Sequence, residues 1–254
     1  MRNLLKFTTF AAASWLAFAL PASAQDFQWT GQLAPGQRIE VVGVNGSITA
    51  STARDGNIVV TGVKKPGRRG NPAEVRIESV ATSDGVTVCV LYGDARCAAG
   101  GARSNNSNDG RNDTSVDFTV QVPAGIRLVA RTVNGSIDAN GLMSDTEAST
   151  VNGSVTVATS GAARANTVNG TIKAAMGQFN GGRFSTVNGA VTLQLPAGIN
   201  ADVRASTVSG DITSDFPLQI DAERGPKRAE GTIGAGGQRL DISTVNGAIT
   251  LARR

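Results

Sequence analysis

The 254-residue sequence has no histidine, only two cysteines, one tyrosine and two tryptophans. Without histidine the chain cannot carry a Ser–His or Cys–His catalytic pair, and a single pair of cysteines does not supply the ligands of a usual structural zinc site. Aromatic residues make up 4% of the chain, whereas glycine occurs 31 times. This balance favours thin β-structure with many tight turns over a thick globular core.

The first 24 residues have the three parts of a secretory signal peptide. Two cations precede an apolar run from 7 to 20, which ends at Pro21 and a stretch of small residues. The run is shorter than the roughly 20 apolar residues of a membrane-spanning helix, so we expect cleavage after Ala24 rather than a membrane anchor. We therefore predict a signal peptide at 1–24 and an exported domain at 25–254.

Charge and cysteine content narrow the class of protein further. The chain has 24 Lys+Arg and 20 Asp+Glu, so its charge is nearly balanced and gives little reason to expect a nucleic-acid partner. Export to an oxidising compartment predicts a disulfide between Cys89 and Cys97, and two free thiols are the alternative. The bond would close a short loop and stabilise the fold by about 2–3 kcal/mol.

A short motif, Thr-Val-Asn-Gly followed by a strand-like segment, recurs along the chain. Its asparagines are Asn45, Asn134, Asn152, Asn169, Asn188 and Asn246. One further copy has Ser209 in the asparagine position. From Asn134 the steps between successive copies are 18, 17, 19 and 21 residues, and the step from Ser209 to Asn246 is 37. We interpret the long step as two periods, with a degenerate copy at 230–233.

The spacing of the motif argues against a series of hairpins. Asn-Gly often marks a two-residue hairpin turn, but a meander would repeat its turns every 8–12 residues or so. Around each Asn position, the residues four before, three after and five after are nearly all apolar, and the residue between the last two is polar. This is the alternation of a strand with one buried face. We predict an all-β fold: a single right-handed parallel β-solenoid with about 17–21 residues per coil and Asn–Gly corners.

The corners should carry regular features. We expect the six asparagines to line up in a hydrogen-bonded ladder. Glycine should supply positive φ at the Asn–Gly corners and at a second set of corners, which contains Gly141, Gly161, Gly177 and Gly198. Two irregular regions interrupt the stack: a basic turn at 64–72 and a polar loop at 93–115, held at one end by the cysteine pair.

One column of residues is basic. Arg164, Arg183 and Arg204 each stand five residues before the Asn position, so sequential stacking would place them one above the next. Such a row of guanidinium groups is a candidate anion-binding site, and the expected partner is an envelope component: an anionic glycan, a lipid headgroup or a protein. The alternative is a row of solvated side chains that keeps the sheet soluble. The acidic residues are scattered, so we predict no catalytic residue, no metal site and no cofactor.

Several motifs in order resemble the bacterial putative-adhesin family of DUF4097-type domains, which have a β-solenoid or toast-rack shape. They are the Val-Pro-Ala-Gly turn at 122–125, the run of Thr-Val-Asn-Gly coils, and the ending Gly-Gly-Gln-Arg-Leu at 236–240 with its last motif at 244–249. The resemblance implies a non-enzymatic protein of the bacterial periplasm or cell surface, acting as an adhesin or a partner-binding scaffold. The alternatives are a periplasmic sensor in an envelope-stress response and, third, a polysaccharide-active enzyme.

Overall fold

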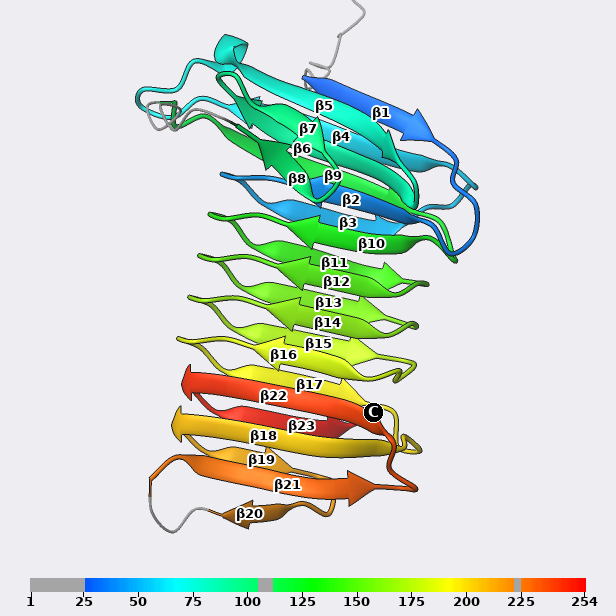
Figure 1. Ribbon diagram of the computed structural model, residues 1–254, viewed down its shortest axis with the longest axis vertical. Coiled ribbons are helices and arrows are strands. Elements are labelled where there is room, and N and C mark those ends of the chain that lie inside the picture. The colour runs from blue at the N-terminus through cyan, green and yellow to red at the C-terminus, as the bar shows by residue number, and fades with distance from the viewer. Residues whose placement is uncertain (1–25, 105–111, 222–224) are drawn as a thin grey trace, which may run out of the picture.

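The computed structural model describes residues 26–104, 112–221 and 225–254, and it forms a tall stack of two large β-sheets that face each other (Figure 1). The predicted signal peptide lies outside the described residues, as does the middle of the polar loop, 105–111. In the part of the chain that is described, no helix has both the length and the apolar character needed to cross a membrane.

The first sheet has ten strands. In spatial order they are β1 (Phe27–Gly31), β4 (Ile58–Lys65), β9 (Ser115–Val122), β3 (Ile48–Thr52), β11 (Ile137–Leu142), β13 (Val155–Thr159), β15 (Ile172–Met176), β17 (Val191–Leu195), β23 (Ile249–Arg253) and β19 (Ile212–Ser214).

The second sheet has eleven strands. They are β20 (Gln219–Asp221), β21 (Lys227–Ile233), β18 (Ala201–Ser209), β22 (Gln238–Asn246), β16 (Gly182–Ser185), β14 (Ala163–Asn166), β12 (Thr146–Ser149), β10 (Arg127–Arg131), β2 (Arg38–Val42), β6 (Gly85–Tyr92) and β5 (Val75–Thr82). A separate hairpin pairs β7 (Arg96–Ala98) with β8 (Gly101–Arg103), and a short 3-10 helix spans Pro72–Glu74.

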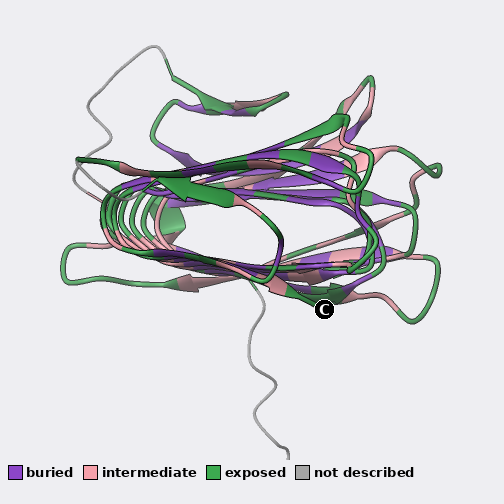
Figure 2. Ribbon diagram, turned by 90° about the horizontal axis from the view of Figure 1, so that it is seen from below, coloured by how far each residue is buried: buried purple, intermediate pink, exposed green. Residues whose placement is uncertain are grey.

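Each middle coil contributes one strand to each sheet, with the Asn–Gly corner between them. Strand β14 pairs in parallel with β12 and β16, and β15 pairs in parallel with β13 and β17. The apolar columns face inward: Ala165 and Ile172 are fully buried, whereas Lys173 between the core positions is exposed. Seen along the stack, the buried residues line the space between the two sheets (Figure 2). The predicted all-β parallel solenoid is confirmed.

The six motif asparagines form one continuous row, which we call the asparagine ladder. Five hydrogen bonds of 2.8 Å join them, each from the side-chain Nδ2 of one asparagine to the Oδ1 of the next, from Asn134 to Asn45 at one end and from Asn246 to Asn188 at the other. The backbones of the same residues are joined by parallel bridges. The amides of this corner therefore satisfy one another along the stack.

The other residues of the motif are explained by how closely the coils approach. The motif threonines are buried, and each Oγ1 donates to the carbonyl of the neighbouring motif glycine; Thr167, for example, lies 2.9 Å from the oxygen of Gly153. A Cβ on that next glycine, Gly170, would lie only 2.0 Å from the same oxygen. The corner therefore requires a residue without a side chain, because a Cβ would overlap the backbone of the adjacent coil.

The predicted reason for these glycines was wrong at most positions. Among the motif glycines that the structure describes, only Gly46 and Gly210 have a positive φ in the left-handed range. At the second corners only Gly141 does, with φ 67°. Gly161 and Gly177 lie against the backbone of the preceding coil, whereas a Cβ added at Gly198 would meet no atom within 4 Å. Close packing, rather than left-handed backbone, is the main requirement.

The order of coils in space differs from their order in sequence. The C-terminal coil, β22–β23, lies between the coil of β16–β17 and the coil of β18–β19. Residues 230–233, which the repeat pattern predicted to be a degenerate coil, belong instead to β21, which runs antiparallel to β18. The ladder gives the physical reason: Ser209 has no carboxamide, so its coil fits at the end, and Asn246 continues the row from Asn188.

Antiparallel strands cover both ends of the second sheet and the N-terminal end of the first. At the N-terminal end β1 pairs with β4, β4 with β9, and β5 with β6. At the C-terminal end β21 pairs with β18 and β20 with β21. The predicted basic turn is the connection between β4 and β5. These antiparallel strands protect three of the four edges of the coil stack, whereas β19, the last strand of the first sheet, pairs only with β23.

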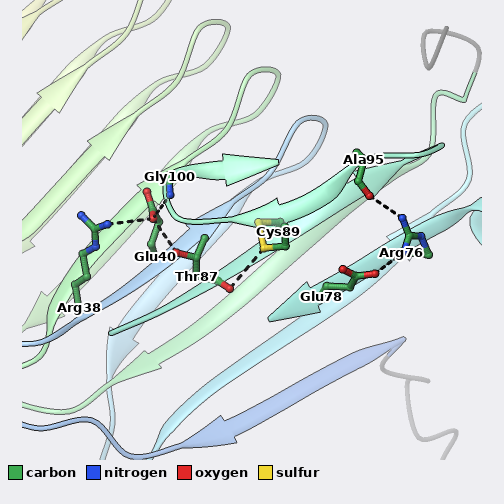
Figure 3. The surroundings of a disulfide bond; sticks show 9 residues. Arg38, Glu40, Arg76, Glu78, Thr87, Cys89, Ala95 and Gly100 are labelled. Atoms are coloured by element: carbon green, nitrogen blue, oxygen red, sulfur yellow. Dashed lines mark hydrogen bonds and ion pairs between the residues drawn. A yellow bond between two sulfur atoms is a disulfide. The ribbon is translucent and has the colours of Figure 1, made fainter. Parts of the chain in front are cut away.

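The disulfide between Cys89 and Cys97 fixes the β7–β8 hairpin on the outer face of β6. A second contact joins the start of the hairpin to β5: the Arg76 Nη2 donates to the Ala95 carbonyl at 2.7 Å (Figure 3). The cysteine pair thus ties down the described beginning of the predicted polar loop, 93–104.

Beneath this hairpin lies a fully buried carboxylate, Glu40. Its Oε2 accepts from the Thr87 hydroxyl at 2.9 Å and from the Gly100 backbone N–H at 3.1 Å (Figure 3). Its Oε1 lies 3.3 Å from a guanidinium nitrogen of Arg131. A buried charge is tolerated only with such partners, so the hairpin and the carboxylate depend on each other.

Reducing the disulfide should therefore loosen the hairpin. We expect the free energy of unfolding to fall by about 2–3 kcal/mol, the loop-closure contribution of a bond that closes so short a loop. The chain has no other cysteine, so reduction is specific. Thermal melting of the oxidised and reduced protein, together with hydrogen exchange at the Gly100 amide, measures both effects. Unchanged melting and unchanged protection of that amide would contradict the prediction.

Candidate binding face

The outer face of the second sheet carries the polar side chains of the coils in regular rows. On β16 the buried Phe184 points into the core, so its neighbours Arg183 and Ser185 point outward. The same alternation on β22 and β18 turns Asp241 and Arg204 outward. We call the part formed by Arg183, Arg204, Arg239 and Asp241 the arginine face.

The pairing of strands fixes the order of the charged row. Glu147 pairs with Arg164, and the alignment of Ala165 with Phe184 sets Arg164 beside Arg183. From Arg183 the row continues to Asp241, then Arg204, then Glu230. The expected uninterrupted stack of three arginines was therefore wrong: Asp241 separates Arg183 from Arg204, because the C-terminal coil is inserted between their strands.

The ion pairs on this face differ in closeness. The Arg239 Nε lies 2.8 Å from the Asp241 Oδ1. Arg183 reaches the same carboxylate at 3.7 Å, and the Arg204 Nε lies 3.8 Å from an oxygen of Glu230. The last two exceed hydrogen-bonding distance, and the side chains of Arg183 and Arg204 are 70% and 64% exposed. Exposed pairs of this kind add little stability, so these guanidinium groups keep donors available to a ligand.

Two adjoining hollows lie over the arginine face. One, of about 730 Å³, is lined by Asp202, Glu230 and Thr232, among others, and the second has a volume of about 350 Å³. Both are lined by Arg204 and Arg239. Hydroxyl groups from a row of serines border the smaller hollow: Ser185, Ser206 and Ser243. The lining offers charge and hydrogen bonding rather than apolar contact.

Asp202, at the edge of the larger hollow, is held in its charged form. It accepts from the Gly237 backbone N–H at 3.0 Å and from the Thr232 hydroxyl at 3.0 Å. The hydrogen bond from Gly237 is the main cause that lowers the pKa of this carboxyl, and the hydrogen bond from Thr232 adds to it. The hollow therefore carries a negative charge at neutral pH directly beside its arginines, because Asp202 pairs across the strands with Arg239 and shares the outer face of β18 with Arg204.

The side chains of the arginine face offer hydrogen-bond donors at several positions. Within the described ranges, no three His, Cys, Asp or Glu side chains come close enough together to hold a metal ion. The arginines and serines can bind carboxylate, sulfate, phosphate and hydroxyl groups through hydrogen bonds.

Sequence reasoning missed Arg239 and misplaced Asp241. Asp241 falls in the same sequence column as the three arginines, but taking the coils in sequence order put it beyond Arg204 rather than between Arg183 and Arg204. The signal that could have corrected this is Ser209: a coil without the ladder asparagine is the one expected at the end of the row.

A second exposed row runs beside the asparagine ladder. The motif valines are each about two-fifths exposed, such as Val151 at 38% and Val168 at 39%. Val208, in the end coil, is 57% exposed. The valines inside the row are less exposed than Val208 because valines of the coils on either side partly cover them. This packing between neighbouring coils explains why the motif contains valine.

Comparisons with known proteins give one family match and several solved structures of low sequence identity. The family model described as Toastrack DUF4097 matches residues 46–252. No curated protein matches the chain.

Among solved structures, the chain is similar to a "putative cell adhesion protein" from Clostridium sporogenes, with 9% identity, 90% of this chain and 99% of the other covered, and a TM-score of 0.40. It is also similar to a "putative adhesin" from Bacteroides fragilis, with 12% identity, 90% and 96% coverage, and a TM-score of 0.35. A third, from Parabacteroides distasonis, has 12% identity, 88% and 96% coverage, and a TM-score of 0.28.

Proposed function

The chain belongs to the Toastrack family of DUF4097 domains, and from this premise we propose that it is an exported, non-enzymatic scaffold of the bacterial cell envelope that binds an anionic envelope component. The arginine face is the observation that carries the proposal. The secretory pattern of 1–24, the Cys89–Cys97 disulfide and the family match support export to the periplasm or surface.

The rigidity of the coils makes the face suitable for a repeating ligand. Side chains on adjacent strands are held about 4.8 Å apart by the backbone ladder. Arg183 and Arg204 are separated by one strand, so their backbones lie about 10 Å apart. This spacing is close to the length of a disaccharide unit, so an acidic polysaccharide with a charged group on every sugar, or on every second sugar, presents charges at this interval. An anionic glycan lying along the stack could thus contact both arginines in turn.

Asp241 gives the proposal a sharp electrostatic test. Asp241 stands between Arg183 and Arg204 in the strand register. Its carboxylate pairs with Arg183 and Arg239, so it competes with an anionic ligand for their guanidinium donors. Asp241→Asn removes this negative charge while preserving the shape of the side chain. If the ligand is anionic, the variant should bind it more tightly. A ligand held through hydrogen bonds to the carboxylate itself would instead bind the variant less tightly.

The double variant Arg183→Gln/Arg204→Gln should lose binding. We expect an affinity for polygalacturonate at least about tenfold weaker than that of the parent, because each charge-assisted hydrogen bond contributes roughly 1.5–3 kcal/mol. The measurement is retention of residues 25–254 on immobilised polygalacturonate at rising salt. The matched control is Arg54→Gln/Arg68→Gln, which removes the same charge at exposed positions away from the face.

Three outcomes decide between roles. Weaker retention of the face variant alone supports the anionic site. Equal retention of both variants and the parent refutes the arginine face as the site. If the parent captures one protein from envelope extracts and ignores acidic polysaccharide and anionic liposomes, the role as a periplasmic sensor replaces the adhesin-like one.

A further inference from the structure

The strict motif of this protein is built on a chemically labile dipeptide. In an Asn–Gly pair the backbone nitrogen of glycine can attack the side-chain amide of asparagine, since glycine offers little steric hindrance. The chain has eight such pairs. Six belong to the asparagine ladder, and two, Asn140–Gly141 and Asn180–Gly181, do not.

At the interior positions of the ladder, the groups that take part in this reaction are held by neighbouring coils. At Asn152 the side-chain Nδ2 donates to Asn134 and the Oδ1 accepts from Asn169, both at 2.8 Å. The attacking nitrogen, that of Gly153, donates its hydrogen to the Asn169 carbonyl at 3.0 Å. The backbone N–H of Asn152 donates to the Val133 carbonyl at 2.7 Å. Cyclisation must therefore break the coil-to-coil bonds and rotate a backbone that is bonded on both sides.

Asn180–Gly181 lacks these restraints. Asn180 is exposed and lies in the connection between β15 and β16. Neither its side chain nor the backbone N–H of Gly181 has a hydrogen-bond partner among the described residues. Gly181 has φ 79°, in the range that favours glycine. At the other outside pair, the Asn140 amide donates to Asp138, so it is partly restrained.

We propose that Asn180 is a site of spontaneous deamidation in the folded protein, and that stacking protects the ladder asparagines from the same reaction. The Gly181 nitrogen loses its proton and forms a bond to the Asn180 side-chain carbonyl carbon, and the side-chain nitrogen leaves as ammonia. Water then opens the five-membered succinimide at either carbonyl, which yields aspartate or isoaspartate.

The protection has a consequence for damage. A ladder asparagine that is converted to aspartate can no longer donate to its neighbour, and it places a negative charge in a row of amides. Reaction in the ladder requires that coils separate, so the amount of damage at Asn152 or Asn169 records how often the stack has opened. The amount of deamidation at Asn180 depends only on the age of the protein under given conditions, because no coil needs to separate for this asparagine to react.

The test is peptide mapping by mass spectrometry of the folded protein, residues 25–254, after incubation at mildly alkaline pH. Deamidation replaces an amide nitrogen with oxygen, so each product peptide is resolved by mass, and enzymatic methylation of isoaspartate identifies the isomer. We expect the product at Asn180 to form at least about tenfold faster than at Asn152 or Asn169. In denaturant all three asparagines should react at similar rates. Any difference in the folded protein then comes from the fold and not from the residues next to each asparagine.

Asn180→Gln is the matched variant, because glutamine keeps the amide but forms the corresponding ring far more slowly. It should abolish the early product and leave the ladder peptides unchanged. If Asn152 and Asn169 react as fast as Asn180 in the folded protein, stacking does not protect them. If Asn180 reacts no faster than the ladder asparagines and both are slow, the site at Asn180 is refuted. Neither result depends on whether the protein binds an anionic glycan.

Discussion

Replacing Gly170 with alanine should lower the free energy of unfolding by about 3 kcal/mol or more. The new Cβ would lie 2.0 Å from the carbonyl oxygen of Gly153 and 2.5 Å from its carbonyl carbon. Neither atom can move aside as a flexible side chain could, since both belong to the backbone of a coil that is bonded on both sides. The coils would have to separate locally, which weakens the Thr167 and Asn169 hydrogen bonds at the same corner.

Gly198→Ala is the matched control for this prediction. No atom lies within 4 Å of the position of its Cβ, and Gly198 is not among the glycines with positive φ. Here alanine should be neutral or stabilise by up to about 1 kcal/mol, because it reduces the entropy of the unfolded chain. Urea unfolding of the two variants and the parent gives the comparison. Similar midpoints for Gly170→Ala and Gly198→Ala would show that the close approach of the corners is not needed.

A chain that ends at Gly237 should fail to form the C-terminal third of the stack. The missing segment contributes β22 and β23, whose side chains Leu240, Ile242, Ile249 and Leu251 are at most 2% exposed. Burying four such side chains stabilises a fold by about 6–12 kcal/mol, which is comparable to the whole stability of a typical domain. The remaining coil, β18–β19, would lose its parallel neighbours in both sheets.

Limited proteolysis and the cooperativity of thermal unfolding measure the effect of this truncation. We expect cleavage throughout 201–233 and a broadened or absent transition. Removing only Arg254 is the control, because Arg254 is exposed and follows the last residue of β23. The truncated chain could stay stable in one way. Strand β18 could move to pair with β16 in place of β22, because the coil of β18 has the same pattern of buried residues. A truncated chain as stable as the parent would show that β18 does take the place of β22, and that the C-terminal coil is dispensable.

The sequence predicted what each coil does but not where every coil lies. The inward columns and the asparagine ladder follow from a local period, so they could be recognised without knowing which coils are neighbours. The order of the last coils could not, because the strands near Ser209 and Asn246 carry the same alternation and either could follow Asn188. Two features decide which coil follows Asn188. They are the side-chain hydrogen bond from Asn246 to Asn188 and the antiparallel pairing of β21 with β18, and both depend on the tertiary fold.

The same ambiguity of coil order affects the candidate site. Arg183 and Arg204 were recognised from their column, and the structure does place both on one outer face. Their separation by Asp241, and the presence of Arg239 beside it, follow only once the C-terminal strand is inserted. The glycine positions were likewise identified correctly but for another reason, because the approach of one backbone to the next cannot be seen in a single coil.

The assemblies at the two ends of the stack leave the height of the molecule free to vary. Each end is a fixed assembly in which the chain leaves the stack, forms antiparallel strands and returns, whereas the coils between 127 and 195 follow one another directly and pair only with their neighbours. Duplicating or deleting one of these coils would change the length by about 4.8 Å and leave both end assemblies intact. Evolution could thus set how far the two ends of such a protein stand apart by copying a single short stretch of DNA.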